Sequence, residues 1–149
     1  MTIDSSISTA MENAIEKLKL NDRVLLDKKM EWATAHRLAL YLEEYFPGWD
    51  IDCEYNKMGH GLNTKHNSLN KYKRPDIVIH KRERSEKESN LLVIEIKMNL
   101  SDVEDEKKLI DCTSSPNESR PFQYQNGLKV SFFQENFHFK WFKGGQEIV

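Results

Sequence analysis

The segment from Arg74 to Met98 constrains this chain most, because it places charged residues beside and within two apolar runs. The runs are Ile77–Ile79 and Leu91–Ile96, and both have the length and composition of buried β-strands. Asp76 stands directly before the first run, and Glu95 lies near the end of the second. Burying a carboxylate without a partner is strongly unfavourable. We therefore expect a compensating group, and a divalent metal ion acting together with a phosphate is the simplest one.

Length and composition indicate one soluble domain covering residues 1–149. The chain is 38% hydrophobic and 31% charged, which is typical of a globular protein with a heavily solvated surface. Its two cysteines, Cys53 and Cys112, follow no metal-ligand spacing, and we expect both to be small buried residues in a reducing compartment. The N-terminus lacks the pattern of a secretory signal, and no apolar stretch has membrane-spanning length. The expected location is cytoplasmic, with no membrane contact.

Positive charge gathers in the middle of the chain although the net charge is −2. Nine lysines and arginines lie between Lys57 and Lys87, and a local field of this kind can attract a polyanion. Residues 56–73 form a long aperiodic loop, which is typical of functional or disordered segments. Its basic character suits a phosphate backbone, and the candidate nucleic-acid contacts are Lys71, Lys73 and Arg74. A solvated, lysine-rich loop is the alternative interpretation.

Helical spacing of apolar residues predicts two helices before this region. The first covers Ile7–Leu20, and the second runs from about residue 28 to 46 and ends at Pro47-Gly48. Between them, Val24–Leu26 is an apolar patch whose type the pattern leaves open. Glu31 falls on the core-facing side of the second helix and is a candidate site residue. Compensation of the helix dipole is its alternative explanation.

The rest of the chain predicts a mixed α/β sheet. Trp49–Tyr55 alternates as a strand, and the two apolar runs follow. A third helix is expected from Asp102 to about Thr113, and an aromatic C-terminal hairpin, expected to serve the core, ends at Gly144-Gly145. From the second helix onward the order is helix, strand, strand, strand, helix, strand. We expect the first three strands to form an antiparallel meander, with the third helix crossing over to a parallel strand.

This arrangement brings the charged residues of the opening segment to one place. Glu95 and Lys97 are two residues apart in a strand, so they share a face, and Asp76 begins the neighbouring antiparallel strand beside Glu95. Adjacent carboxylates repel each other and favour a hard cation with oxygen ligands, typically Mg²⁺ or Mn²⁺. The cation would polarise a phosphoryl oxygen, and Lys97 would stabilise developing charge. The chemistry expected here is phosphodiester hydrolysis.

Pro75-Asp76 and Glu95-Ile96-Lys97, the latter ending an apolar strand, resemble the motif of the PD-(D/E)XK nuclease superfamily. The resemblance covers residues 31 to about 134 and implies a restriction-endonuclease-like αβββαβ core. An extra N-terminal helix and the last strand of the C-terminal hairpin would be additions to it. It also implies magnesium-dependent cleavage of nucleic acid, with Asp76 and Glu95 as metal ligands and Lys97 as a catalytic residue. The superfamily often adds a carboxylate from its first core helix, and Glu31 is the matching position.

The third helix is also similar to that of small uncharacterised bacterial members of the superfamily, which carry a D-x-x-K-L pattern there. In this chain the pattern consists of Asp105, Lys108 and Leu109. For the charged pair we expect ordinary charge pairing on the surface of the helix.

Three functions stay open at this stage. The first is a magnesium-dependent nuclease acting on DNA, with a homodimer supplying the surface needed to cut both strands. The second is a non-catalytic module that keeps the fold and binds nucleic acid or a protein. The third is a phosphoesterase for small substrates. A purely structural explanation treats Asp76 as a turn residue and Glu95 with Lys97 as an edge-strand pair, but the two-sided apolar character of Leu91–Ile96 favours a central strand.

Overall fold

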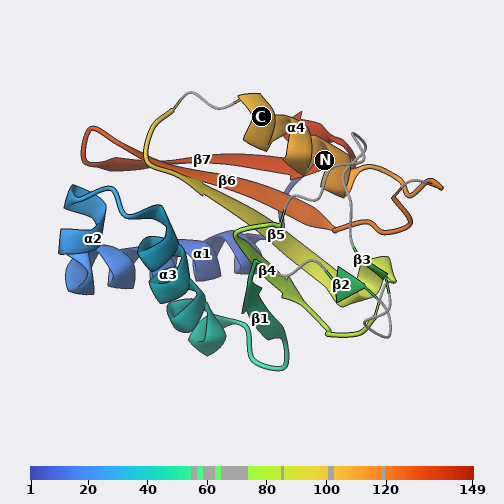
Figure 1. The fold of residues 1–149 in the computed structure, drawn as a ribbon, viewed down its shortest axis with the longest axis horizontal. Coiled ribbons are helices and arrows are strands. Elements are labelled where there is room, and N and C mark those ends of the chain that lie inside the picture. Colours follow the sequence, from blue (N-terminus) through green and yellow to red (C-terminus); the bar gives the residue numbers. More distant parts are fainter. Residues whose placement is uncertain (55–56, 59–62, 65–73, 85, 101–102, 119) are drawn as a thin grey trace.

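Strand β5 (Asn90–Lys97) lies inside a six-stranded sheet of order β1-β4-β5-β6-β7-β8 (Figure 1). The computed structural model describes residues 1–54, 57–58, 63–64, 74–84, 86–100, 103–118 and 120–149. The other strands of the sheet are β1 (Asp50–Cys53), β4 (Ile77–His80), β6 (Asn126–Phe133), β7 (Asn136–Lys143) and β8 (Gln146–Ile148). A separate pair consists of β2 (Lys57–Met58) and β3 (Asn63–Thr64).

The pairing of the strands agrees with the expected topology. Strands β1, β4 and β5 form an antiparallel meander, and β5 pairs with β6 in parallel. The crossover between β5 and β6 contains helix α4 (Val103–Thr113). Strands β6, β7 and β8 continue antiparallel. The α/β class and the mixed sheet are therefore confirmed.

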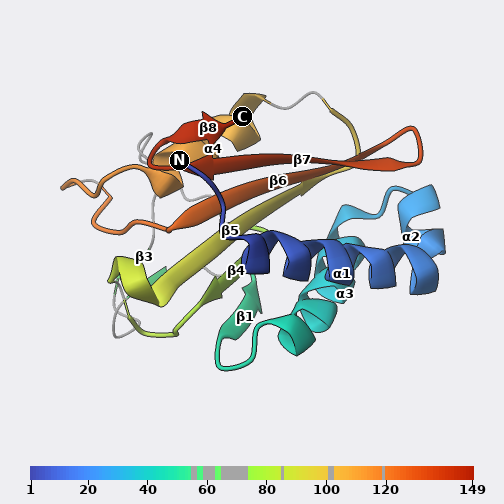
Figure 2. The same cartoon turned by 180° about the vertical axis from the view of Figure 1, so that it is seen from behind.

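Helices cover both faces of the sheet. Helices α1 (Ser5–Asn21) and α3 (Glu31–Tyr45), with the short α2 (Arg23–Asp27), pack on one face, and Figure 2 shows α1 running across it. Helix α4 packs on the other face. A 3-10 turn (Lys87–Ser89) precedes β5. None of the helices that the structure describes is long and apolar enough to span a bilayer.

Side chains of β5 point alternately to the two faces of the sheet and contribute to two separate hydrophobic cores. Leu92, Ile94 and Ile96 belong to the larger core with α1 and α3, whereas Val93 belongs to a smaller core with Leu109 of α4. Because side chains alternate along a strand, Glu95 and Lys97 point to the α4 side together with Val93. The strand is buried on both faces, as its apolar sequence predicts.

The structure assigns one segment whose type the sequence leaves open, and it corrects several local expectations. Val24–Leu26 belongs to helix α2, and α3 begins only at Glu31 because Lys29 has a φ of 55°, outside helical geometry. The sheet does not end at Gly144-Gly145. These glycines have φ values of 61° and 79° and form a turn that leads the chain into a further strand, β8. Cys112 is buried as expected, but Cys53 is exposed because it is the last residue of the edge strand β1.

Arg120 is a buried arginine whose burial the sequence pattern does not predict. Its side chain is 1% exposed and donates to Asp111 Oδ1 at 3.2 Å. The same guanidinium donates to the carbonyl oxygens of Ser114, Ser115 and Phe122 at 3.1, 2.7 and 2.6 Å. It thereby fixes the path of the chain between α4 and β6.

We expect Arg120→Met to lower the free energy of unfolding by about 3–5 kcal/mol, because it removes the buried guanidinium that pairs with Asp111 and donates to three backbone carbonyls. Urea denaturation followed by circular dichroism measures the change. Arg84→Met, at an exposed position, is the control and should stay within about 0.5 kcal/mol of wild type. A fully stable Arg120→Met protein would contradict this assignment.

Candidate active site

Asp76 and Glu95 lie side by side at the junction of β4 and β5. The N–H of Asp76 donates to Glu95 Oε2 at 2.8 Å, and the N–H of Ile96 donates to Asp76 Oδ2, also at 2.8 Å. Each carboxylate therefore accepts a hydrogen bond from the backbone of the other strand. In the antiparallel register Ile77 lies opposite Ile94. Asp76, which precedes Ile77, therefore lies beside Glu95, which follows Ile94. The expected neighbourhood of the two acids is confirmed.

Lys108 pairs with Glu95 from the α4 side of the sheet. Its ammonium group forms an ion pair with Glu95 Oε1, and its Nζ also donates to the carbonyl oxygen of Arg74 at 3.0 Å. The side chains of Lys108 and Glu95 are only 8% and 3% exposed. The expectation that Lys108 takes part in surface pairing is therefore wrong. The sequence held a signal for its burial, since Lys108 shares the apolar side of α4 with Leu109 and Cys112.

Lys97 has a partner on the same helix. Its Nζ lies 3.8 Å from Asp105 Oδ2, with the two side chains 26% and 16% exposed. Asp105 and Lys108 are three residues apart, so one face of α4 presents one charge to each charged residue at the end of β5. The sequence does not predict that Asp105 and Lys108 lie beside Lys97 and Glu95, and the structure shows that they do.

The two strand carboxyls have pKa values above their ordinary range. Burial, followed by the charge of Asp76, raises the pKa of Glu95 to about 8, although Lys108 opposes the shift. Burial also raises the pKa of Asp76, and the nearby charge of Glu31 adds to this effect, while the N–H of Ile96 and Lys108 oppose it. The lysine therefore compensates the negative charge of this pair only in part.

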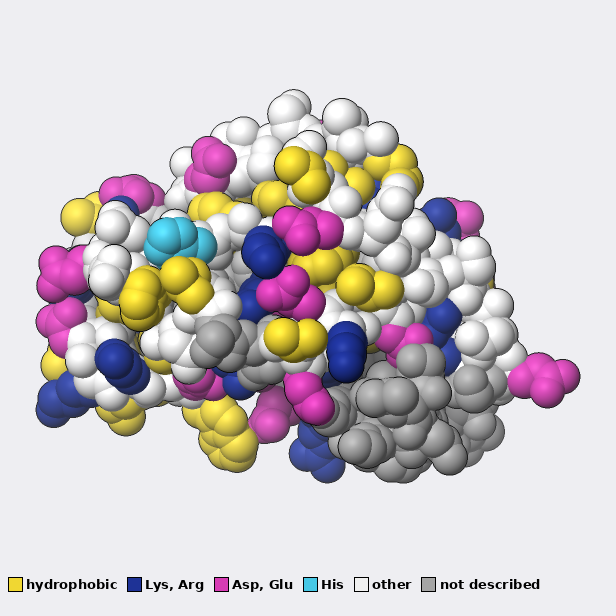
Figure 3. All heavy atoms as spheres, turned by 90° about the horizontal axis from the view of Figure 1, so that it is seen from above, with side chains coloured by type: hydrophobic (Ala, Val, Ile, Leu, Met, Phe, Trp, Pro, Cys, Tyr) yellow, Lys and Arg dark blue, Asp and Glu magenta, His cyan; other side chains and the backbone are white. Residues whose placement is uncertain are grey.

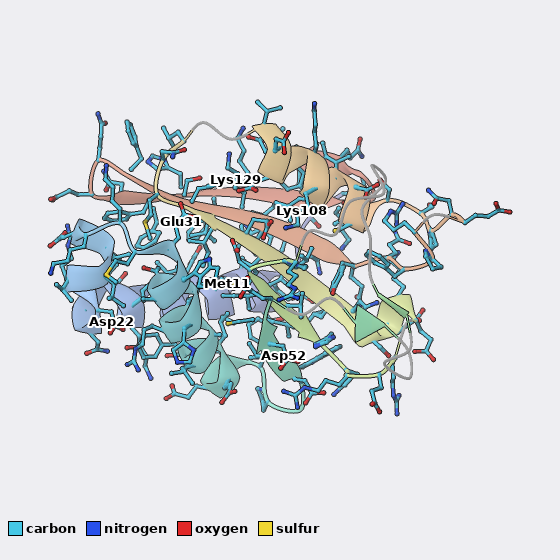
Figure 4. The ribbon with its side chains drawn as sticks, in the orientation of Figure 1. Met11, Asp22, Glu31, Asp52, Lys108 and Lys129 are labelled. Atoms are coloured by element: carbon cyan, nitrogen blue, oxygen red, sulfur yellow. The ribbon has the colours of Figure 1, made fainter. Side chains whose placement is uncertain are left out.

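Glu31 comes from the first turn of α3, on the opposite face of the sheet from Lys108 (Figure 4). Its Oε2 accepts a hydrogen bond of 3.3 Å from the N–H of Met98, directly after β5. The carboxylate thus lies at the end of the strand that carries Glu95 and Lys97, and its charge acts on Asp76. Glu31 approaches the site as expected, but its hydrogen bond joins α3 to the backbone after β5.

A hollow of about 210 Å³ opens beside Asp76. Its lining residues are Trp32, Ala35, His36, Cys53, Glu54 and Asp76. Trp32, one residue after Glu31, is 77% exposed, which is unusual for so large an apolar side chain. Trp32 falls in helical register with the buried Ala35 and Leu38, so the apolar pattern of the helix predicts its burial, and that prediction is wrong. Trp32 lies in the first turn of α3, at the margin of the helix–sheet contact.

The expected basic region is placed only in part. Lys71 and Lys73 lie outside the described residues, as do His60 and His66 of the same loop. Arg74 has an exposed side chain, and its carbonyl holds Lys108. Further along, Arg82 binds Asp52 with its Nε and Nη2 at 2.9 and 2.6 Å, so its charge is compensated. Figure 3 shows acidic and basic side chains intermixed over the described part of the α4 side rather than gathered by sign.

The donor set matches a hard divalent cation in chemistry, since two adjacent carboxylates carry negative charge that their surroundings compensate incompletely. Two observations limit the match. Both oxygens of Glu95 already have partners, Lys108 and the N–H of Asp76. Among the described residues, no group of three or more His, Cys, Asp or Glu side chains is placed to hold a metal ion. A cation at Asp76 and Glu95 would therefore have to take the place of Lys108 at Glu95.

Comparisons with known proteins add no name to this site: no family model, curated protein or solved structure matches the chain.

The raised pKa of Glu95 predicts a pH dependence of stability. The pKa of Glu95 is about 4.5 in the unfolded chain and about 8 in the folded protein. Between these pH values the folded protein keeps a proton that the unfolded chain has lost, so the free energy of unfolding falls as the pH rises from about 4.5 to about 8. We expect Glu95→Gln to remove this decline, which is at most about 1.4 kcal/mol per pH unit for one proton. Unfolding free energies of wild type and variant, measured from pH 5 to about pH 9, test it.

Glu118→Gln, at an exposed position, is the control and should follow the wild-type curve. The comparison uses the slopes of the curves, because Glu95→Gln also changes the ion pair with Lys108 and shifts the whole curve. Parallel slopes for wild type and Glu95→Gln would contradict the raised pKa.

Proposed function

We propose that this protein is a divalent-metal-dependent nuclease that hydrolyses phosphodiester bonds, with DNA as the preferred substrate. The observation that carries the proposal is the convergence of Asp76, Glu95 and Lys97 at the end of two paired, buried strands. Charged groups are costly there, so their presence calls for a chemical reason. The order α3, β1, β4, β5, α4, β6 supports the further proposal of a restriction-endonuclease-like core.

Each residue has a role in this proposal. Asp76 and Glu95 would hold Mg²⁺ or Mn²⁺, which supplies a Lewis acid for the phosphoryl group and a water activated for attack. Their backbone hydrogen bonds keep both carboxylates oriented. Lys97 would place its ammonium group beside the attacked phosphate and stabilise the charge that develops there. Glu31 would fix the end of β5 through Met98 and add negative charge near Asp76.

The hollow beside Asp76 favours a nucleic acid over a small phosphoester. An exposed indole forms one wall, and a nucleobase can stack on such a surface. At about 210 Å³ the hollow is smaller than the roughly 300–1,000 Å³ of sites for drug-sized ligands, so it suits a single ring system. Glu54 disfavours a phosphate in this position but can accept a hydrogen bond from the amino group of a base. Lys71, Lys73 and Arg74 remain the proposed contacts to the phosphate backbone.

Incubation of the purified protein with Mn²⁺ or Mg²⁺ and plasmid, linear or single-stranded DNA tests the activity. Glu95→Gln and Lys97→Met should lower the cleavage rate by about a hundredfold or more, because each removes a group that acts on the transition state. Lys107→Met, an exposed neighbour on α4, should cleave like wild type. If the Glu95 and Lys97 variants retain the wild-type rate, the cleavage comes from a contaminant and the proposal fails.

Trp32→Ala should weaken binding of a labelled single strand by about 1–3 kcal/mol, because it removes the stacking surface, whereas Trp32→Phe should keep most of the affinity. Fluorescence anisotropy in EDTA measures binding without cleavage. Leu20→Ala replaces an apolar residue of similar exposure (76%) on α1 and serves as the control. Equal affinity of wild type and Trp32→Ala for the single strand would contradict the stacking of a base on Trp32.

A non-catalytic nucleic-acid-binding module is the second candidate. The ion pair of Glu95 with Lys108 favours it, because a carboxylate with an internal counter-charge can be purely structural. Calorimetry separates the two functions. Absence of divalent-metal binding, together with salt-dependent DNA binding that Glu95→Ala leaves unchanged, would support the module and contradict the nuclease.

A further inference from the structure

We propose that Lys108 is an internal counter-ion that competes with the divalent cation for Glu95, so that helix α4 sets the metal affinity of the site. This inference rests on the proposed metal-dependent function. It starts from the ion pair between Lys108 Nζ and Glu95 Oε1, whose side chains are 8% and 3% exposed. Water contributes little at such depth, so the ionised form of Glu95 needs a protein cation or a bound ion as its partner.

Lys108 and a metal ion would compete for the same oxygen atom. Glu95 Oε2 accepts the hydrogen bond from the N–H of Asp76, so Oε1, the oxygen that pairs with Lys108, is the one that a cation would take. Two cations on one carboxylate also repel each other strongly where the effective dielectric constant is low.

Lys108 has a second partner that makes such a movement possible. Its Nζ lies 3.0 Å from the carbonyl oxygen of Arg74, which does not belong to the carboxylate pair. The flexible lysine side chain can therefore leave Glu95 and keep one hydrogen bond. The side chain of Lys108 points from α4 toward the sheet (Figure 4), and its backbone position on the helix need not change. Without metal, the lysine compensates the carboxylates and holds the end of the sheet together.

The test is calorimetric titration of Mn²⁺ into wild type and Lys108→Met, which keeps an unbranched side chain and removes the charge. We expect Lys108→Met to bind Mn²⁺ about tenfold or more tightly than wild type, because the competing cation is gone. Lys107→Met is the matched control, one residue away and exposed, and should bind like wild type.

Thermal denaturation in EDTA and in Mn²⁺ gives a second readout that does not depend on activity. Lys108→Met should have a lower melting temperature than wild type in EDTA, because Glu95 has lost its cationic partner. Mn²⁺ should raise the melting temperature of Lys108→Met by more than it raises that of wild type. Lys108→Arg tests the opposite direction and stays informative if the methionine variant does not fold. A guanidinium pairs more firmly with a carboxylate than an ammonium, so its Mn²⁺ binding should be several-fold weaker than that of wild type.

The outcomes separate the two proposals. Equal Mn²⁺ affinity of wild type and the Lys108 variants would overturn the competition and leave the metal site intact. Weaker binding by Lys108→Met would also overturn it, because the lysine would then be assisting the ion. If wild type and Lys108→Met both bind no Mn²⁺ at this site, the proposed metal-dependent function itself fails, and the competition fails with it.

Discussion

The buried charge of Glu95 is the constraint on which the rest of this structure depends. A carboxylate inside a sheet that helices cover on both faces cannot rely on water, so the protein must bring every partner to it. The backbone of β4 supplies one hydrogen bond through Asp76, and α4 supplies a cation through Lys108. The position of α4 over β5 is therefore constrained by charge as well as by its contacts with Val93.

The same requirement explains why the two faces of the sheet differ. The face toward α1 and α3 is a continuous apolar core, and it tolerates no charged residue from β5. The α4 face combines a smaller apolar core with the ion pairs of Glu95 and Lys97. Arg120 lies near this face as well, where it binds Asp111 of α4. Buried polar groups thus concentrate around one helix.

Much of the fold followed from local patterns. Helices α1, α3 and α4, the meander and the parallel β5–β6 pairing could be predicted because hydrophobic periodicity and short connections leave few topologies. The adjacency of Asp76 and Glu95 followed for the same reason, since an antiparallel connection places one strand's start beside the other's end. Strand β8 and the exposure of Cys53 could not be predicted, because they depend on where the edges of the sheet lie.

The sequence by itself determined the order of the elements, the central position of β5 and the meeting of Asp76 with Glu95. All of these depend on alternation and on neighbours along the chain. Only the tertiary structure decided that Lys108 and Asp105 pair with Glu95 and Lys97, that Trp32 lies exposed beside the candidate site, and that Arg120 is buried. These features depend on the rotation of α4 about its axis and on contacts between distant segments. A pattern of apolar residues shows which side of a helix is buried, but it does not show which charge on that side meets which strand.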